Sequence, residues 1–192
     1  MRIGRLLLRL VVGGFFFGHG TQKLLGWFGG NGLQGTAEGF ESLGLRPGKV
    51  HASAAGVTEA GGGTLLLLGL ETPLAAAMLT ATMLTAIRTV HGKNGPWASN
   101  GGYEYNVVLI AVAIALAEIG PGPLSLDALR GRERAGTGWA LAALGAGAIG
   151  AVGVQQAVAR QAVPSQAPGQ DSPQAPESER AAPDGQPLPQ AA

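Results

Sequence analysis

Apolar residues along the chain fall into five runs, which are separated by polar connections rich in glycine and proline. The runs cover residues 3–25, 50–70, 74–90, 103–119 and 137–158. In a helix each residue adds about 1.5 Å, so about 20 apolar residues cross the roughly 30 Å hydrocarbon core of a bilayer. Because each run is close to this length, the pattern predicts an all-α integral membrane helical bundle with five membrane-spanning helices.

The connections between the runs agree with these boundaries. Residues 26–49 form a glycine-rich loop, in which residues 36–43 are predicted to form a short interfacial helix that is too polar to span the bilayer. Pro73 stands where proline favours the start of a helix. Pro121 and Pro123 follow the fourth run and end it.

The end of the chain has a different composition from the rest. Residues 161–192 hold seven of the twelve prolines and almost no large apolar residue. A segment of this kind cannot bury a core, so it is predicted to be a disordered tail. The expected organisation is therefore a four-helix transmembrane domain over residues 1–132, a fifth transmembrane helix within 133–160 and the tail over 161–192.

Small residues recur at four-residue intervals in two of the runs. Such ridges allow two helix backbones to approach closely in a membrane. They predict the packing faces of the second and fifth helices, whereas Ala113 in the fourth helix is expected to face lipid. The ridges consist of Ala52, Gly56, Ala60 and Thr64 in the second run, and of Ala142, Ala146 and Gly150 in the fifth.

Composition limits the chemistry that the chain can perform. Only 13% of its residues are charged, about half of the usual share, and a net charge of +1 gives no indication of nucleic-acid binding. The chain has no cysteine and therefore no thiolate metal site or thiol redox centre of its own. Its three histidines include two at predicted helix ends, so the sequence indicates neither a metal site nor an intrinsic cofactor.

Five polar side chains are expected in one half of the bundle, and they form the candidate ligand-binding cluster: His19, Lys23, Glu59, Arg88 and Glu104. A charge inside a bilayer costs of order 2.5–3.5 kcal/mol and persists when it is paired or hydrated. The arrangement of lowest cost pairs Glu59 with Arg88, with His19 nearby and Lys23 at the rim. The alternative is structural, with Lys23 extending to the headgroups and His19 packing or capping. No catalytic residue can be assigned.

Basic residues predict the orientation of the chain. We call the side of Met1 side A and the opposite side side B. The basic residues number six on each side, so the tight clustering of those on side A is what favours a cytoplasmic side A and N-terminus. The side-A cluster consists of Arg2, Arg5, Arg9, Arg130, Arg132 and Arg134.

Four motifs in this order resemble the DoxX family of small four-helix membrane proteins. They are R-L-L-L-R…G-H-G-T-Q-K…G-W-F-G-G (residues 5–30), E-A-G-G-G (59–63), G-G-Y-E-Y (101–105) and G-P-G-P-L-S-L-D (120–127). The resemblance covers about residues 1–132. DoxX-like proteins are associated with a thiosulfate:quinone oxidoreductase and with membrane complexes of bacterial oxidative-stress defence. The resemblance therefore implies a multi-pass protein of the bacterial inner membrane with a link to redox chemistry.

Three functions remain open on these grounds. In the first, the protein is an accessory or anchor subunit of a membrane redox system, its partners are a soluble oxidoreductase or other membrane subunits, and it could form a homo-oligomer. In the second, it is a quinone-interacting oxidoreductase subunit in which His19, Arg88 and Glu59 bind the quinone head group. A small-solute transporter is the third, and it is disfavoured because the runs show no inverted repeat.

Overall fold

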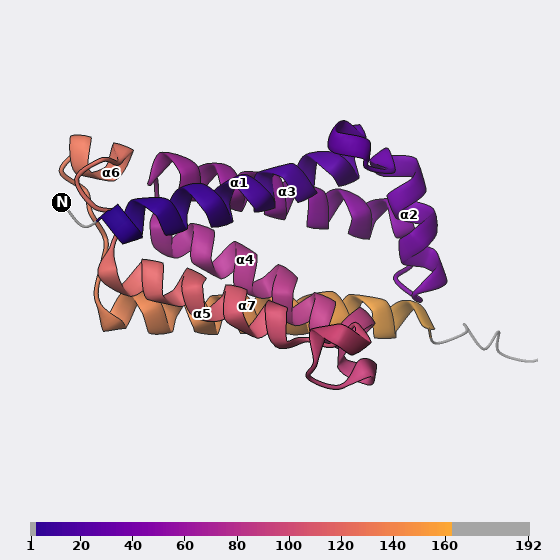
Figure 1. The fold of residues 1–192 in the computed structure, drawn as a ribbon. Coiled ribbons are helices and arrows are strands. Elements are labelled where there is room, and N and C mark those ends of the chain that lie inside the picture. The colour runs from indigo at the N-terminus through magenta and orange to yellow at the C-terminus, as the bar shows by residue number, and fades with distance from the viewer. Residues whose placement is uncertain (1–2, 163–192) are drawn as a thin grey trace, which may run out of the picture.

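The computed structural model describes residues 3–162, and within this range the regular elements are all helices. The predicted all-α bundle is thus confirmed. Five long helices run alternately in opposite directions (Figure 1): α1 (Ile3–Leu25), α3 (Gly48–Leu68), α4 (Thr72–Ala86), α5 (Glu104–Ile119) and α7 (Thr137–Ala162). The predicted tail lies outside the described residues, except for its first two positions, which extend α7.

Short helical segments lie at the two ends of the bundle. At side B, the predicted interfacial helix is present as α2 (Gly32–Ser42). The remaining segments on this side are η1 (Trp27–Gly29), η2 (Ile87–His91), η3 (Gly92–Asn94) and η4 (Ala98–Asn100). At side A, α6 (Leu126–Leu129) lies beside the start of α1, so that the N-terminus and the connection between α5 and α7 share one end (Figure 1).

Within residues 3–162, three helical segments are long and apolar enough to cross a membrane: Ile3–Leu25, Thr72–Asn94 and Thr137–Gln161. The second of these is α4 together with η2 and η3. Helix α3 has sufficient length, but its sequence contains several glycines and Glu59, which lower its hydropathy. Helix α5 is strongly apolar but has only 16 residues. Both run alongside the three spans (Figure 1), and their crossing of the bilayer stays a prediction.

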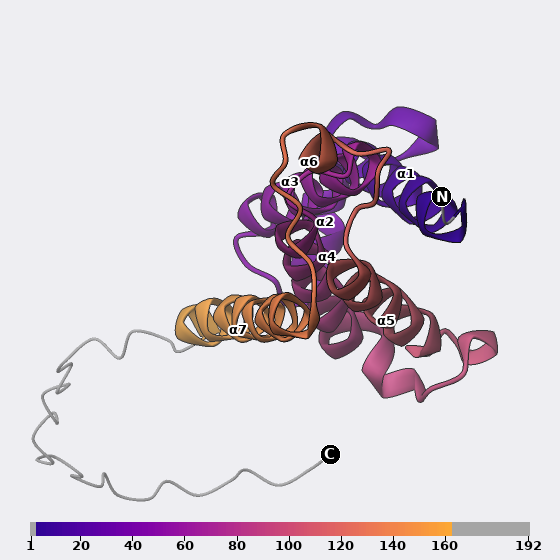
Figure 2. The same cartoon turned by 90° about the vertical axis from the view of Figure 1, so that its left-hand side faces the viewer.

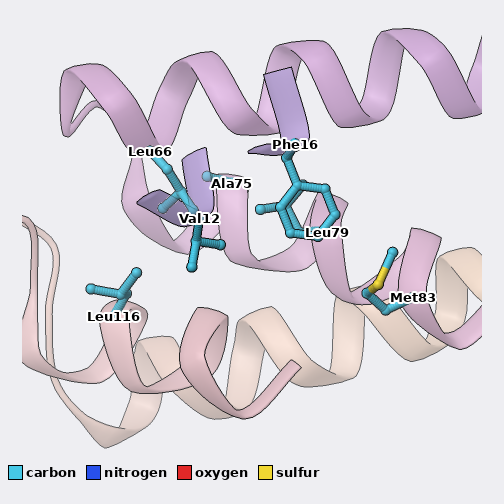
Figure 3. Packing of buried hydrophobic residues seen from close by; sticks show 7 residues of the cluster. All are labelled: Val12, Phe16, Leu66, Ala75, Leu79, Met83 and Leu116. Atoms are coloured by element: carbon cyan, nitrogen blue, oxygen red, sulfur yellow. The ribbon is translucent and has the colours of Figure 1, made fainter. Parts of the chain in front are cut away.

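Helix α4 occupies the centre of the bundle and contacts α3, α5 and α7 (Figure 2). Its buried face presents Leu79 and Met83 to side chains from three other helices. In Figure 3, Phe16 of α1 lies against Leu79, while Leu66 of α3 and Leu116 of α5 approach from opposite sides. This cluster joins α1, α3, α4 and α5 into one packed unit.

Helices α1 and α3 pack through glycines along much of their length. A Cβ atom added at Gly13 would lie 2.8 Å from the Gly63 carbonyl oxygen, and one at Gly20 would lie 2.6 Å from the Gly56 carbonyl oxygen. These are backbone-to-backbone contacts, which only small residues permit. The predicted ridge of the second run is thus confirmed at Gly56, and its packing partner is α1.

The predicted ridge of the fifth run is wrong. In α7 the buried positions are Ala140, Ala143, Gly147 and Ala151, whereas Ala142, Ala146 and Gly150 are exposed. The sequence of α7 is rich in alanine and glycine on every face, so the small-residue spacing does not identify one of them. The expected lipid exposure of Ala113 is also wrong, because this residue is fully buried in an alanine cluster that joins α4, α5 and α7.

Two glycines of α1 provide a matched test of the α1–α3 contact. Gly20→Ala would place its methyl group 2.7 Å from Ala60 Cα, whereas a Cβ at Gly18 has no atom within 4 Å. Both substitutions gain about 1 kcal/mol of helix propensity. We expect Gly18→Ala to be neutral or stabilising and Gly20→Ala to lose roughly 1–3 kcal/mol through overpacking. Thermal unfolding in detergent measures the difference, and equal midpoints for the two variants would contradict the contact.

Candidate functional site

The close packing of α1 and α3 brings Lys23 and Glu59 together at side B. Lys23 Nζ lies 2.5 Å from Glu59 Oε2, and the two side chains are 23% and 6% exposed. Glu59 follows Gly56 by one helical turn, next to the contact with Gly20, so a lysine one turn beyond Gly20 reaches it. The pair neutralises a carboxylate that is almost fully removed from solvent.

The predicted pairing of Glu59 with Arg88 is therefore wrong. Arg88 lies in η2, its side chain is exposed, and it takes part in no ion pair within the described part of the chain. The prediction placed both residues at a similar depth, but depth does not fix the direction in which a helix face points. The close contact of α1 with α3 decides the partner of Glu59.

The other two members of the predicted cluster form no hydrogen bond or ion pair with Lys23 or Glu59 within the described residues. His19 is exposed on α1, and its Nδ1 lies 3.1 Å from Gln22 Oε1. Glu104 begins α5, and its Oε1 accepts a hydrogen bond from the Ala98 backbone N–H at 2.7 Å, which fixes the preceding loop. Of the five candidate residues, the structure thus brings together only Lys23 and Glu59. Ligand binding by any of the five stays a prediction.

A second polar site, centred on Arg9, lies at side A. The Arg9 side chain is 1% exposed although it belongs to an apolar helix. Its Nε and Nη2 donate to the carbonyl oxygens of Leu66 and Leu67, each at 2.9 Å. Its Nη1 donates to Pro121 O at 2.7 Å and to Leu124 O at 2.9 Å. The guanidinium therefore joins α1 to the end of α3 and to the connection that follows α5.

The local sequence explains why Arg9 fits at this place. The carbonyls of a last helical turn have no partner within the helix and favour a cation. Helix α3 ends at Gly69, whose φ of 61° lies in the left-handed region that favours glycine. A Cβ atom at Gly69 would lie 2.5 Å from Arg9 Nη2, so the absence of a side chain makes room for the guanidinium.

Further bonds hold the connection between α5 and α7 against the same end of the bundle. The Asp127 backbone N–H donates to Gly69 O at 3.1 Å. Ser125 Oγ accepts from the Ala128 N–H at 3.1 Å and so caps α6. Arg134 forms an ion pair with Glu71 and lies 5.5 Å from the centre of the Trp139 ring. Residues 120–136 are thus fixed to α1, α3, α4 and α7 without any long regular element of their own.

Sequence reasoning missed the Arg9 site because Arg9 was interpreted as one of the basic residues that flank the first span. One signal in the sequence could have identified it. Arg9 stands between Leu8 and Leu10, well inside the apolar run, and an ionisable residue at such a depth needs a partner. The identity of that partner could not be predicted, because backbone carbonyls from two distant segments leave no mark in the sequence.

The chain is similar in sequence to known proteins. The DoxX family profile matches residues 4–92, which extend from α1 to the first residue of η3. A protein of Bacillus subtilis (strain 168) described as "Putative oxidoreductase CatD" is 35% identical over 125 residues, which make up 65% of this chain and 85% of that protein. No solved structure matches the chain.

A double-mutant cycle tests the ion pair at side B. Glu59→Gln and Lys23→Met should each destabilise the protein, because each leaves the other charge without its partner in a region of low dielectric. The double variant should recover part of the loss, with a coupling of roughly 0.5–3 kcal/mol in detergent unfolding. Arg88→Met is the control, and we expect a change within about 0.5 kcal/mol. Additive effects of Glu59→Gln and Lys23→Met would mean that the two side chains do not interact.

Substitution of Arg9 tests the site at side A. Arg9→Met keeps much of the side-chain length but removes the donor to the carbonyls of Leu67, Pro121 and Leu124, and each buried unpaired group costs about 1–3 kcal/mol. Leu66 O would still accept from the Gly69 N–H at 3.1 Å. We expect a loss of more than about 3 kcal/mol and faster amide hydrogen exchange over residues 120–131. Arg9→Lys should retain only part of the stability, because an ammonium cannot reproduce the planar fork.

Exposed Arg130 on the same connection is the control for Arg9. Arg130→Met should leave the exchange of residues 120–131 unchanged. Equal exchange in the Arg9 and Arg130 variants would show that Arg9 does not hold this connection.

Proposed function

The chain belongs to the DoxX family, and we propose that it is the membrane-embedded accessory subunit of a redox system, which holds a soluble oxidoreductase or further membrane subunits at the bilayer. One observation carries this proposal. Buried Arg9 and partly buried Lys23 already have structural partners, since Arg9 donates to four carbonyls and Lys23 pairs with Glu59. These groups stabilise the bundle and its side-A end, which suits a rigid anchor.

The redox link is supported by the relative from Bacillus subtilis, which is described as an oxidoreductase. The chain itself has no cysteine, and within residues 3–162 no three His, Asp or Glu side chains lie close enough together to hold a metal ion. In the proposed system, a partner or a diffusible quinone carries the electrons.

We place the protein in the bacterial inner membrane with side A in the cytoplasm. The arginines of α1 and those of residues 130–134 are clustered at this end of the bundle (Figure 1), and this clustering, not the number of basic residues, supports the orientation. The connection held by Arg9 lies at the same end. A partner that docks there would meet a fixed surface and would not have to order a loose loop.

A quinone-interacting subunit with a site of its own is the second candidate. It is favoured by His19, which is exposed on α1 one helical turn before Lys23, so that proton-transferring groups lie near a lipid-facing surface. A quinone ring does not fit between α1 and α3, because the backbones are in contact at Gly20 and Gly56. A quinone would have to bind from the lipid side, which makes this candidate the weaker one.

Purification of the tagged chain from its native membrane in mild detergent tests the proposal. We expect an oxidoreductase to copurify in fixed ratio, and deletion of the chain should reduce the membrane-bound fraction of that enzyme. After the partner has been stripped from the membranes, inverted vesicles, which expose the cytoplasmic face, should bind it again. Right-side-out vesicles should not bind it. A chain that carries one quinone per molecule and reduces it to the quinol with electrons from an added small-molecule reductant, without any protein partner, would overturn the proposal in favour of the second candidate.

A further inference from the structure

An open groove of about 520 Å³ lies at side A, between the first turns of α1 and the connection around α6. Its volume falls in the range of small-molecule sites. Two opposite charges line it, those of Arg5 and Glu133, together with apolar side chains that include Pro123 and Leu129. The groove plays no part in the Arg9 network or in the ion pair at side B.

The two charged groups of the groove have hydrogen-bonding and ion-pairing capacity that no described residue uses. Arg5 Nη1 donates to Ile119 O at 2.7 Å, and this is the single hydrogen bond of its guanidinium to the described residues. A guanidinium carries five N–H donors. Glu133 is exposed and forms no ion pair within residues 3–162. One cation and one carboxylate with free capacity therefore line the same hollow.

The wall of the groove is built around the guanidinium of Arg5. Gly122 has a φ of 82°, and a Cβ atom there would lie 2.6 Å from both Cζ and Nε of Arg5. The missing side chain lets the guanidinium lie against the backbone of the connection. Because the bond to Ile119 O fixes one edge of the guanidinium, the remaining donors have a restricted set of directions. Such restriction lowers the entropy lost on binding.

With α1 crossing the bilayer as proposed, the groove lies at the level expected for the lipid headgroups. It is bordered by the beginning of α1, and Ile119, the Arg5 acceptor, is the last residue of α5. Trp139, in the first turn of α7 at the same end, is 45% exposed, and tryptophan favours the membrane–water interface. Leu129 in the groove wall is 81% exposed, and it offers apolar surface beside the charges. A ligand with a charged head and an apolar body matches this arrangement.

We propose that this groove binds the phosphoethanolamine headgroup of a zwitterionic phospholipid, with the phosphate on Arg5 and the ammonium on Glu133. Guanidinium groups bind phosphate oxygens through paired hydrogen bonds. A carboxylate in the same groove would repel a purely anionic headgroup, and it attracts a primary ammonium. Pro123 and Leu129 would contact the glycerol and the upper part of the acyl chains. The inference does not depend on the redox role proposed above.

Native mass spectrometry of the full-length protein in detergent tests this site. The probes are dioleoyl phosphatidylethanolamine, phosphatidylglycerol and phosphatidylcholine, added separately in equal amounts. We expect one molecule of phosphatidylethanolamine to bind about two- to fivefold more tightly than either of the others, as a contact between partly exposed charges provides. Equal affinities for the three lipids would overturn the proposal.

Substitutions of Arg5 and of Glu133 test separately which residue binds the phosphate and which binds the ammonium. Arg5→Gln should weaken the binding of phosphatidylethanolamine and phosphatidylglycerol alike. Glu133→Gln should abolish the preference between these lipids, and because Glu133 is exposed and unbonded, this variant is expected to fold as the natural chain does. Arg130→Gln and Glu118→Gln, which alter charges at the same end but outside the groove, should leave the preference intact.

A preference that survives Glu133→Gln would overturn the assignment of the ammonium and with it the proposal. Soluble O-phosphoethanolamine distinguishes a lipid from a free headgroup. It should not displace the bound lipid at equal concentration, because it lacks the apolar body. Displacement at that concentration would show that the groove binds the soluble headgroup and is not a lipid site.

Discussion

The four hydrogen bonds of Arg9 are the interaction on which the side-A half of the structure depends. They join residue 9 to carbonyls 57 and 58 positions away in α3, and to others 112 and 115 positions away in the connection after α5. Without water, each unpaired carbonyl in a membrane interior costs several kcal/mol. One guanidinium donates to four carbonyls, of which Leu66 O also accepts from the Gly69 N–H, and it places the end of α3 and the start of the connection at defined positions relative to α1.

At side B, in contrast, the packing of two helices decides where the charged residues lie. Glycines bring the backbones of α1 and α3 into contact at Gly20 and Gly56, and Lys23 then lies within reach of Glu59. Helices in lipid gain no hydrophobic free energy from associating, so close contact between small residues is their main source of stability. The ion pair is a consequence of that contact, which explains why the more distant and exposed Arg88 is not the partner.

The dependence of charged partners on helix packing also explains how much of the fold and of the site the sequence predicts. Apolar runs and prolines mark the helices because length and hydropathy are local properties, and the ridge at Gly56 was identifiable because small residues recur there at every fourth position. In α7, alanine and glycine occupy all faces, so the ridge at Ala142 was the wrong choice. Partners such as Glu59 and Lys23, or Arg9 and Pro121, depend on the rotation of helices about their axes. One sequence without structure does not fix that rotation.

The two ends of the bundle therefore differ in what their polar residues hold together. At side B, the polar pair lies between two helices in backbone contact, and the histidine beside it faces outward. At side A, a connection without long regular structure is held by Arg9, by Arg5 and by the ion pair of Arg134 with Glu71. A loop that is tied at several points loses little entropy when it binds a further molecule. The same bonds that satisfy the carbonyls of α3 thus give side A the fixed surface that the proposed binding of a lipid headgroup and of a protein partner needs.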